Sequence, residues 1–327
     1  VSIPLRRSAT PLHDTALRWL KKMQSAEFEE KDYEGPLYRE LLLGNHRIAT
    51  PGQVFENAFG VDAVLEADHP IFWDLFGFPD IPRGIFLNHY RWPWIYRRHG
   101  RHRDLPTFEV NLLIQAKRPD QLSGVNSVLS KKGIKGSYWR FKIREHQQEL
   151  LEKLEARLRK RALVVYASPA FHDLSSLYKH TDNQVIVENS TFVRPVRLRS
   201  HHYWNYNIPG TYGVATSKPE SIEEPGFYEQ LDKRLLQVEP SEPRSALKEL
   251  EDDVLAISNE SENNPIAKHF LFLNEERFYR LSEISSTQSK YLISYLKVYT
   301  FFELLNTTWL VAGNETKPSQ QDSGGNG

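Results

Sequence analysis

The sequence contains no cysteine in its 327 residues. This absence excludes disulfide bonds, metal sites built on thiolates and a cysteine nucleophile. It fits a reducing compartment, so we expect a cytoplasmic protein. The N-terminal stretch VSIPLRRSATPLHDTALRWLKK mixes charged and apolar residues, and we therefore expect no signal peptide.

Several motifs that mark nucleotide-driven and hydrolytic enzymes are also missing. The sequence has no P-loop, no G-x-G-x-x-G after a strand, no H-E-x-x-H and no G-x-S-x-G. We therefore expect any nucleotide-driven chemistry to be supplied by a partner.

Long apolar runs are scarce. The one candidate for a membrane span is the stretch 291–312, YLISYLKVYTFFELLNTTWLVA. Lys297 and Glu303 lie inside it, and ionisable groups are costly at bilayer depth. We predict a buried packing helix and no membrane partner, with a membrane-surface role as the alternative.

The net charge is zero, but the charges are unevenly distributed. From Arg83 to Arg161 there are about 19 Lys and Arg against about 7 Asp and Glu, and from Pro219 onward about 10 against about 19. Basic regions can bind polyanions, although solvated helix faces give the same pattern. We predict that the basic middle binds nucleic acid. The acidic third is predicted to mediate self-association or contact with a partner protein, or to cover the basic middle until activation.

Sequence patterns divide the chain into four segments. We predict an N-terminal helical segment (1–50), an α/β domain (51–218), a mostly helical, acidic C-terminal region (219–312) and a disordered tail (313–327). The expected elements are helices at 15–31, 51–68 and 144–161, strands at 108–119, 162–171 and 184–193, and a flexible basic loop at 123–137. Strand–helix–strand order around the helix 144–161 favours a parallel crossover.

The strand 108–119, FEVNLLIQAKRP, carries an unusual set of polar residues for an apolar strand. Because side chains alternate, Val110, Leu112, Ile114 and Ala116 share one face, and Glu109, Asn111, Leu113, Gln115 and Lys117 share the other. Gln115 and Lys117 are then about 7 Å apart. An oxygen of the first can ligate a divalent metal while the second approaches the same phosphate, which suits phosphodiester hydrolysis.

These residues resemble the active-site motif of the PD-(D/E)xK nuclease superfamily. In that family an acid precedes (D/E/Q)-x-K on the next strand, and a helix and another strand follow. Gln115-Ala116-Lys117 is similar to the Q-x-K variant of enzymes related to type IV restriction endonucleases. The resemblance covers roughly residues 50–170 and implies a restriction-endonuclease-like mixed sheet flanked by helices, with Mg²⁺ or Mn²⁺ as the cofactor.

The acid of the motif has three candidates. Asp80 follows Pro79 but lies far before Gln115, which requires an enlarged hairpin. Glu109 shares the face of Gln115, yet six strand residues span about 20 Å. Asp104 is near but leaves little room for a strand and a turn. We favour Asp80 as the metal ligand beside Gln115, then Glu109, then Asp104.

The resemblance also implies roles for two helices. Some relatives carry a glutamine on the crossover helix that faces the active site, and Gln147 or Gln148 matches it, with Gln147 on the sheet-facing stripe. Many relatives carry a glutamate on the first helix, which Glu56 matches. Each residue also has an ordinary role available, such as a snorkelling lysine or a glutamine that satisfies backbone groups.

Further polar residues are candidates for binding. Paired His201 and His202 lie among aromatics and could bind metal or stack nucleobases, but we favour an aromatic core edge. His99 and His102 have metal-compatible spacing, although their arginine neighbours favour phosphate contact. The residues predicted to contact nucleic acid are Arg101, Arg103, Arg118, Lys131, Lys132 and Gln147.

Together these features predict a metal-dependent DNA endonuclease with Glu56, Asp80, Glu109, Gln115 and Lys117 as its catalytic candidates. A role in prokaryotic restriction or anti-phage defence follows from the resemblance alone. The alternative is a non-catalytic nucleic-acid-binding or scaffold subunit with a nuclease-like fold, since Gln115 replaces the usual carboxylate. A metal-dependent enzyme centred on His201 and His202 is the third possibility.

Overall fold

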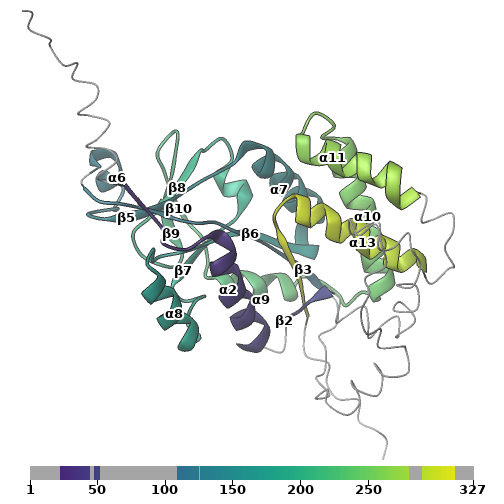
Figure 1. Ribbon diagram of the computed structural model, residues 1–327, viewed down its shortest axis with the longest axis horizontal. Helices are drawn as coiled ribbons and strands as arrows, with labels where there is room; N and C mark the ends of the chain where they lie inside the picture. Colours follow the sequence, from purple (N-terminus) through teal and green to yellow (C-terminus); the bar gives the residue numbers. More distant parts are fainter. Residues whose placement is uncertain (1–22, 45–47, 52–108, 125, 280–288, 314–327) are drawn as a thin grey trace, which may run out of the picture.

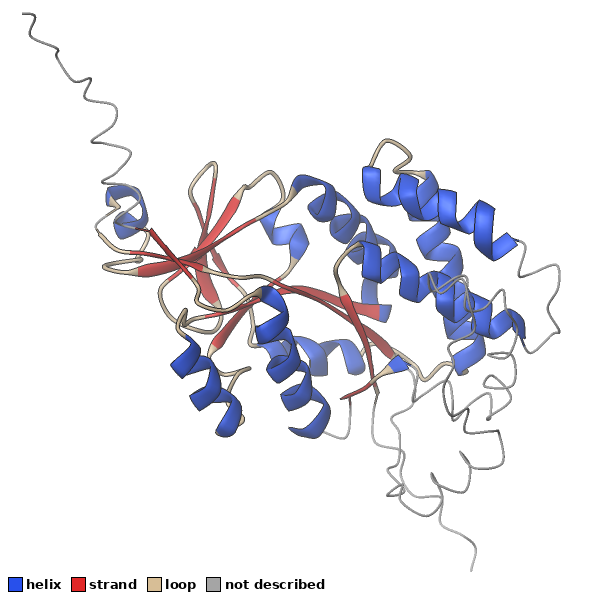
Figure 2. Cartoon of the chain, in the orientation of Figure 1, coloured by secondary structure: helices blue, strands red, loops and turns tan. Residues whose placement is uncertain are grey.

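A computed structural model of the chain describes residues 23–44, 48–51, 109–124, 126–279 and 289–313. Its architecture is mixed α/β with two sheets, one mixed and one antiparallel, as Figure 1 and Figure 2 show. The mixed α/β class predicted from the sequence is thus confirmed.

The mixed sheet has five strands in the order β2-β11-β3-β6-β7. β3 and β6 are parallel, and the other neighbours are antiparallel. Both parallel strands are buried along their whole length, which explains their near-continuous apolar sequences. The strands are β2 (Ile48–Ala49), β11 (Thr308–Ala312), β3 (Val110–Ala116), β6 (Ala162–Pro169) and β7 (Ser190–Val193).

The second sheet is antiparallel throughout and has the order β1-β4-β5-β8-β9-β10. β4 begins just after β3 ends, so the chain passes directly from one sheet to the other. The strands are β1 (Met23–Ser25), β4 (Asp120–Leu122), β5 (Tyr138–Lys142), β8 (Tyr203–Tyr206), β9 (Tyr212–Thr216) and β10 (Glu220–Glu223).

Helices cover both faces of the five-stranded sheet (Figure 1). One face packs against α7 (Glu145–Leu158), α10 (Pro243–Asn259), α11 (Pro265–Leu273) and α13 (Ser289–Leu304). The other packs against α2 (Glu30–Gly44), α8 (Leu174–Asp182) and α9 (Phe227–Leu235). The remaining short helices are α6 (Ser127–Lys131), the 3₁₀ turns Arg159–Arg161 and Pro195–Leu198, and a π turn at Asn274–Phe278.

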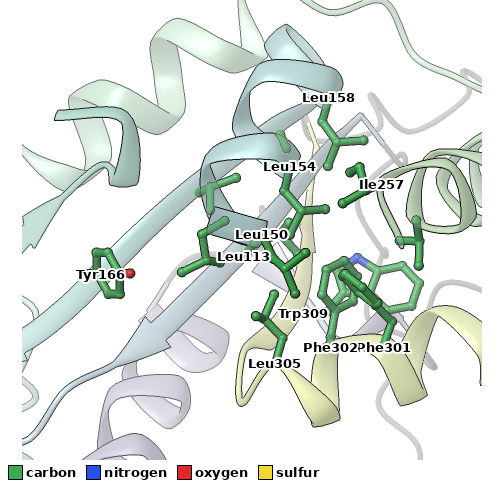
Figure 3. Close-up of a cluster of buried hydrophobic side chains, with 14 of the residues drawn as sticks. Leu113, Leu150, Leu154, Leu158, Tyr166, Ile257, Phe301, Phe302, Leu305 and Trp309 are labelled. Carbon is green, nitrogen blue, oxygen red and sulfur yellow. The ribbon is translucent and has the colours of Figure 1, made fainter. Parts of the chain in front are cut away.

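The crossover predicted around the helix 144–161 is confirmed, because α7 lies between the parallel strands β3 and β6. The apolar stripe of α7 packs into the core with β3 and the C-terminal helices (Figure 3). Its members Leu150, Leu151, Leu154 and Leu158 are at most 1 % exposed. The helical spacing of these leucines is therefore what attaches α7 to the sheet.

The stretch 291–312 is only partly the helix that its sequence predicts. α13 ends at Leu304, and the chain then turns at Asn306 in the left-handed region (φ 54°) and forms β11. Within α13, Lys297 is paired with Glu251 of α10 at 2.8 Å, which explains how an apolar run carries a lysine. In the described part of the chain, no helix is long and apolar enough to cross a membrane.

Three other expected elements differ from the structure. The predicted helix 15–31 is wrong at its C-terminal end, because Met23–Ser25 form β1 and α2 begins only at Glu30. The loop 123–137 contains α6, whose first turn is capped by the Asn126 side chain. The strand expected at 184–193 is restricted to Ser190–Val193. The predicted helix 51–68 lies outside the described residues, except for Pro51.

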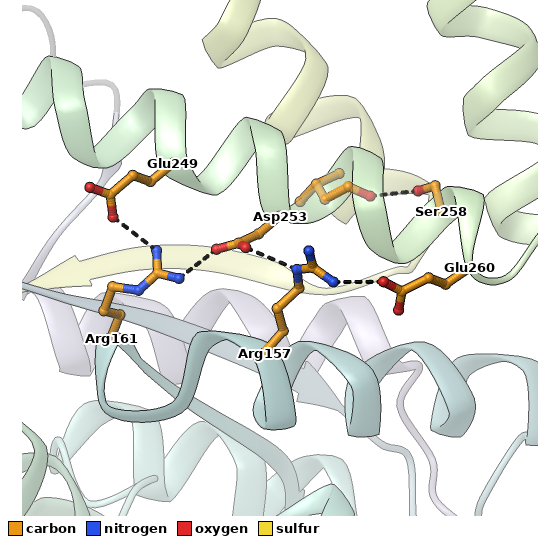
Figure 4. Close-up of polar contacts among 7 residues, drawn as sticks. Arg157, Arg161, Glu249, Asp253, Ser258 and Glu260 are labelled. Atoms are coloured by element: carbon orange, nitrogen blue, oxygen red, sulfur yellow. Dashed lines mark hydrogen bonds and ion pairs between the residues drawn. The ribbon is translucent and has the colours of Figure 1, made fainter.

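The acidic C-terminal region is integrated with the basic middle (Figure 4). Asp253 of α10 pairs with both Arg157 (3.0 Å) and Arg161 (2.6 Å), and Glu249 and Glu260 complete the network. The helices α7 and α10 also contribute buried leucines to the same core. In the five-stranded sheet, β11 lies between β2 and β3. Ion pairs within the chain therefore neutralise part of the basic excess.

Candidate active site

The polar face of β3 is the face that the alternation predicts. Leu113 packs in the core beneath α7, whereas Leu112 and Ile114 pack in the core beneath α2 and α9. Gln115 is 0 % exposed and Lys117 only 3 %. Both polar side chains are therefore inside the molecule, where each needs partners.

Lys117 and Gln115 meet residues from α7 and from the turn before β11. The Lys117 Nζ donates a hydrogen bond to Oε1 of Gln147 (2.9 Å). The amide nitrogens of Gln115 and Gln147 both donate to the carbonyl oxygen of Leu305 (3.2 Å each). Three distant segments are thus joined at the end of β3, and Gln147 is the α7 glutamine that belongs to this group.

Gln148 has a different role. Its Oε1 accepts a hydrogen bond from the Tyr166 hydroxyl, and its nitrogen donates to the carbonyl oxygen of Pro195 (2.7 Å each). These contacts fasten α7 to β6 and to the 3₁₀ turn at Pro195–Leu198. The Tyr166 ring also lies 5.5 Å from Lys117 Nζ, so it forms one wall of the lysine site.

Two glutamates of α2 supply negative charge near Lys117. Burial lowers the pKa of Lys117 to about 8, while Glu30 and Glu34 act to raise it and Arg144 acts to lower it further. Glu30 accepts a hydrogen bond from Asn306 (3.3 Å), and Glu34 is buried and paired with Lys31 (2.7 Å). Neither glutamate was predicted from the sequence as a site residue.

A signal for these acids was present in the sequence. Glu30 and Glu34 are four residues apart, so both carboxylates lie on one side of a helix. Tyr33, Leu37 and Leu41 form the apolar stripe of the same helix. A pair of acids beside such a stripe is a candidate for the rim of a site, although the sequence alone does not reveal which strand it faces.

Two buried oxygen atoms at the site lack partners among the described residues. They are Oε1 of Gln115 and Oγ1 of Thr307, which follows the Asn306 turn. An unsatisfied buried acceptor is costly. The carbonyl oxygen of Gln115 is also a ligand type that Mg²⁺ and Mn²⁺ accept, as is the Glu30 carboxylate. The match to a divalent cation is one of ligand type.

Other candidates have structural partners away from Lys117. Glu109 precedes β3 and lies at the end opposite Gln115, where its N–H donates to Ala312 (3.2 Å). Arg118 pairs with Glu29 (2.7 Å) and donates to the carbonyl oxygen of Ala26, so it anchors the chain before α2.

The remaining predicted residues fall into two groups. Lys131 and Lys132 are exposed at the end of α6, as a nucleic-acid contact requires. The candidates Glu56, Asp80, His99, Arg101, His102, Arg103 and Asp104 lie outside the described residues.

The paired histidines have separate partners. His201 Nε2 lies 3.4 Å from Glu220, whereas His202 Nδ1 lies 3.0 Å from the Ser217 hydroxyl. Among the described residues, no group of three or more His, Cys, Asp or Glu side chains is arranged to hold a metal ion.

Comparisons with protein-family models, with curated proteins and with solved structures find no match for this chain. The function of the site must therefore follow from its own geometry.

The buried Lys117 gives the stability of the protein a defined pH dependence. Its pKa falls from 10.5 in the unfolded chain to about 8 in the fold, so the unfolded state binds the proton more tightly. The free energy of unfolding should therefore rise as the pH increases from about 8 to about 10.5, by on the order of 3 kcal/mol. Urea denaturation across this range measures the rise. Lys117→Met should lack this contribution, and parallel pH curves for the two proteins would contradict the assignment.

Proposed function

We propose that this protein is a metal-dependent DNA endonuclease that hydrolyses phosphodiester bonds. The observation that carries the proposal is the hydrogen bond between Lys117 and Gln147 beside Gln115, with Glu30 and Glu34 of α2 close enough to act on the lysine charge. A cation, a neutral oxygen ligand and carboxylates thus occur together at the end of a buried strand.

Each residue has a role in this proposal. Gln115 and Glu30 would hold Mg²⁺ or Mn²⁺, and Asp80, outside the described residues, stays the proposed further ligand. When bound, the cation supplies neutralisation of phosphate charge and an acidified water. Lys117 binds the phosphate as a cation below its pKa of about 8. Gln147 orients the lysine through its side-chain oxygen.

The biological setting remains part of the proposal. The resemblance of Gln115-Ala116-Lys117 to a Q-x-K nuclease motif supports a role in prokaryotic restriction or anti-phage defence. The exposed Lys131 and Lys132 support contact with DNA. Arg157 and Arg161 form ion pairs with acidic residues of the C-terminal region, so we assign them a structural role and not a DNA contact.

A second candidate is a nucleic-acid-binding scaffold that keeps this arrangement without cleavage. The observation that favours it is the burial of Gln115 and Lys117. Gln115 and Gln147 donate to the turn before β11, and Lys117 donates to Gln147. In that case the polar group stabilises the junction of β3, α7 and β11.

The test is cleavage of plasmid DNA with Mg²⁺ or Mn²⁺ and with chelator. Glu30→Gln keeps an acceptor for Asn306 but removes the charge, so we expect cleavage to fall by about 10- to 100-fold. Glu229→Gln, an exposed glutamate of α9, is the matched control and should cleave like the unmodified protein.

Three outcomes separate the candidates. Metal-dependent cleavage that Glu30→Gln weakens supports the endonuclease. DNA binding without cleavage under any metal condition supports the scaffold. A protein that neither binds nor cleaves DNA contradicts both.

A further inference from the structure

A pocket of about 240 Å³ lies on the antiparallel sheet, on the face turned away from the main core. The opposite face of this sheet contributes Phe141, Trp204 and Tyr206 to the core beneath α7. The residues that line the pocket include Leu129, Tyr138, Arg140, Asn205 and Thr216. Residues from α6 thus form one wall, and β5, β8 and β9 form the floor.

Arg140 is the charged group of this pocket, and it has no carboxylate partner among the described residues. Its guanidinium lies 4.6 Å from the centre of the Tyr203 ring and 3.5 Å from the sulfur of Met23. Its Nε is buried without a hydrogen-bond partner. Asp120 stands opposite Arg140 in the strand register, but its carboxylate accepts from the Ser25 hydroxyl.

Other arginines of the fold contrast with Arg140. Arg157, Arg161, Arg194 and Arg199 each form an ion pair with a glutamate or aspartate. An arginine without a carboxylate partner is suited to a phosphate, because the planar fork of its guanidinium matches phosphate geometry.

The rest of the pocket adds donors and keeps them in place. Asn205 is 2 % exposed, and its nitrogen donates to Val214 (2.8 Å) and to the hydroxyl of Thr216 (3.1 Å). Because Thr216 accepts that bond, its own hydrogen is available for a ligand. Lys131 and Lys132 do not line the pocket, but they lie exposed at the end of α6, whose residues form one of its walls.

Chain geometry keeps the pocket near Lys117. Asp120 follows Lys117 by three positions and pairs with Arg140. Extended backbone covers at most about 3.6 Å per residue, and paired Cα atoms lie about 5 Å apart, so the Cα atoms of Lys117 and Arg140 are within about 16 Å.

From these observations we propose that the Arg140 pocket binds a backbone phosphate of the DNA substrate, at a position separate from the bond held at Lys117. The inference rests on the proposed function, because it assigns the substrate of that site a second contact. Arg140 and Thr216 bind the phosphate oxygens, Tyr203 holds the guanidinium in place, and α6 brings its lysines alongside the strand.

The test is DNA binding measured by fluorescence anisotropy with a labelled duplex, in chelator, as a function of salt concentration. Arg140→Gln should weaken binding by about tenfold and reduce the slope of log affinity against log salt by about 1. Arg140→Lys keeps the charge and should retain the slope with a smaller loss of affinity. Arg199→Gln removes the same charge from an exposed arginine paired with Glu152 and is the matched control.

Three results would overturn the pocket assignment. Arg140→Gln could bind DNA with unchanged affinity and slope, Arg199→Gln could lose as much affinity as Arg140→Gln, or the protein could bind no DNA. Thermal melting of every variant verifies folding. The two proposals fail separately. If Glu30→Gln cleaves DNA like the unmodified protein while Arg140→Gln needs a higher DNA concentration, only the catalytic site is contradicted. Full activity and affinity in Arg140→Gln contradict the pocket alone.

Discussion

Lys117→Ala should lower the rate of metal-dependent DNA cleavage by about 10²- to 10³-fold, which is typical for loss of one preorganised charge at a reacting phosphate. The lysine is 3 % exposed and held by Gln147, so its ammonium group is preorganised before substrate binds. A water molecule in the space left behind has neither the charge nor the fixed position. DNA affinity should change much less than the rate, because other groups bind the backbone.

Single-turnover cleavage of plasmid, beside anisotropy with the labelled duplex, separates the two effects. Lys117→Met is the companion variant, because it fills the same space and should be at least as stable as the unmodified protein near neutral pH. Lys160→Ala, at an exposed position after α7, is the matched control. Cleavage that survives Lys117→Ala but is lost in His202→Ala would move the active site to the paired histidines.

Trp309→Ala should lower the free energy of unfolding by about 3–5 kcal/mol, the usual cost of removing a buried tryptophan. Trp309 is 5 % exposed on β11 and packs against Phe302 of α13 (Figure 3). It also packs against Tyr295 of the same helix. Its ring N–H donates to the Asn111 side chain on β3 (2.9 Å). The residue therefore joins the acidic C-terminal region to the strand that carries Gln115 and Lys117.

Urea denaturation measures this loss. Trp309→Phe keeps most of the apolar surface but leaves Asn111 without its donor, so it should cost about 1–3 kcal/mol. Phe272→Ala, at a position of α11 that is 58 % exposed, is the matched control and should change stability by less than about 1 kcal/mol. Equal losses in Trp309→Ala and Phe272→Ala would show that β11 does not hold the sheet together.

Local sequence predicted the parts of the site that depend on periodicity. Alternation along β3 places Gln115 and Lys117 on one face, and helical spacing places Gln147 on the stripe of α7 that faces the sheet. These predictions succeed because each depends on residues within one element, where backbone geometry fixes the direction of every side chain.

Predictions that depend on distant partners were less complete. Short apolar runs such as 308–312 fit a helix or a strand equally well, and only pairing with β3 decides between them. The choice of acid is also non-local, because α2 and β3 are far apart in the chain. Glu30 is brought near Lys117 by the packing of Tyr33, Leu37 and Leu41 beneath the sheet.

The sequence by itself determined the mixed α/β class, the crossover through α7 and the common face of Gln115 and Lys117. Only the tertiary structure decided what surrounds that face. The carbonyl oxygen of Leu305 lies 190 positions from Gln115 in the chain, yet it accepts from both glutamines. The physical reason is that a buried polar group takes its partner from whichever segment the packed core brings to it.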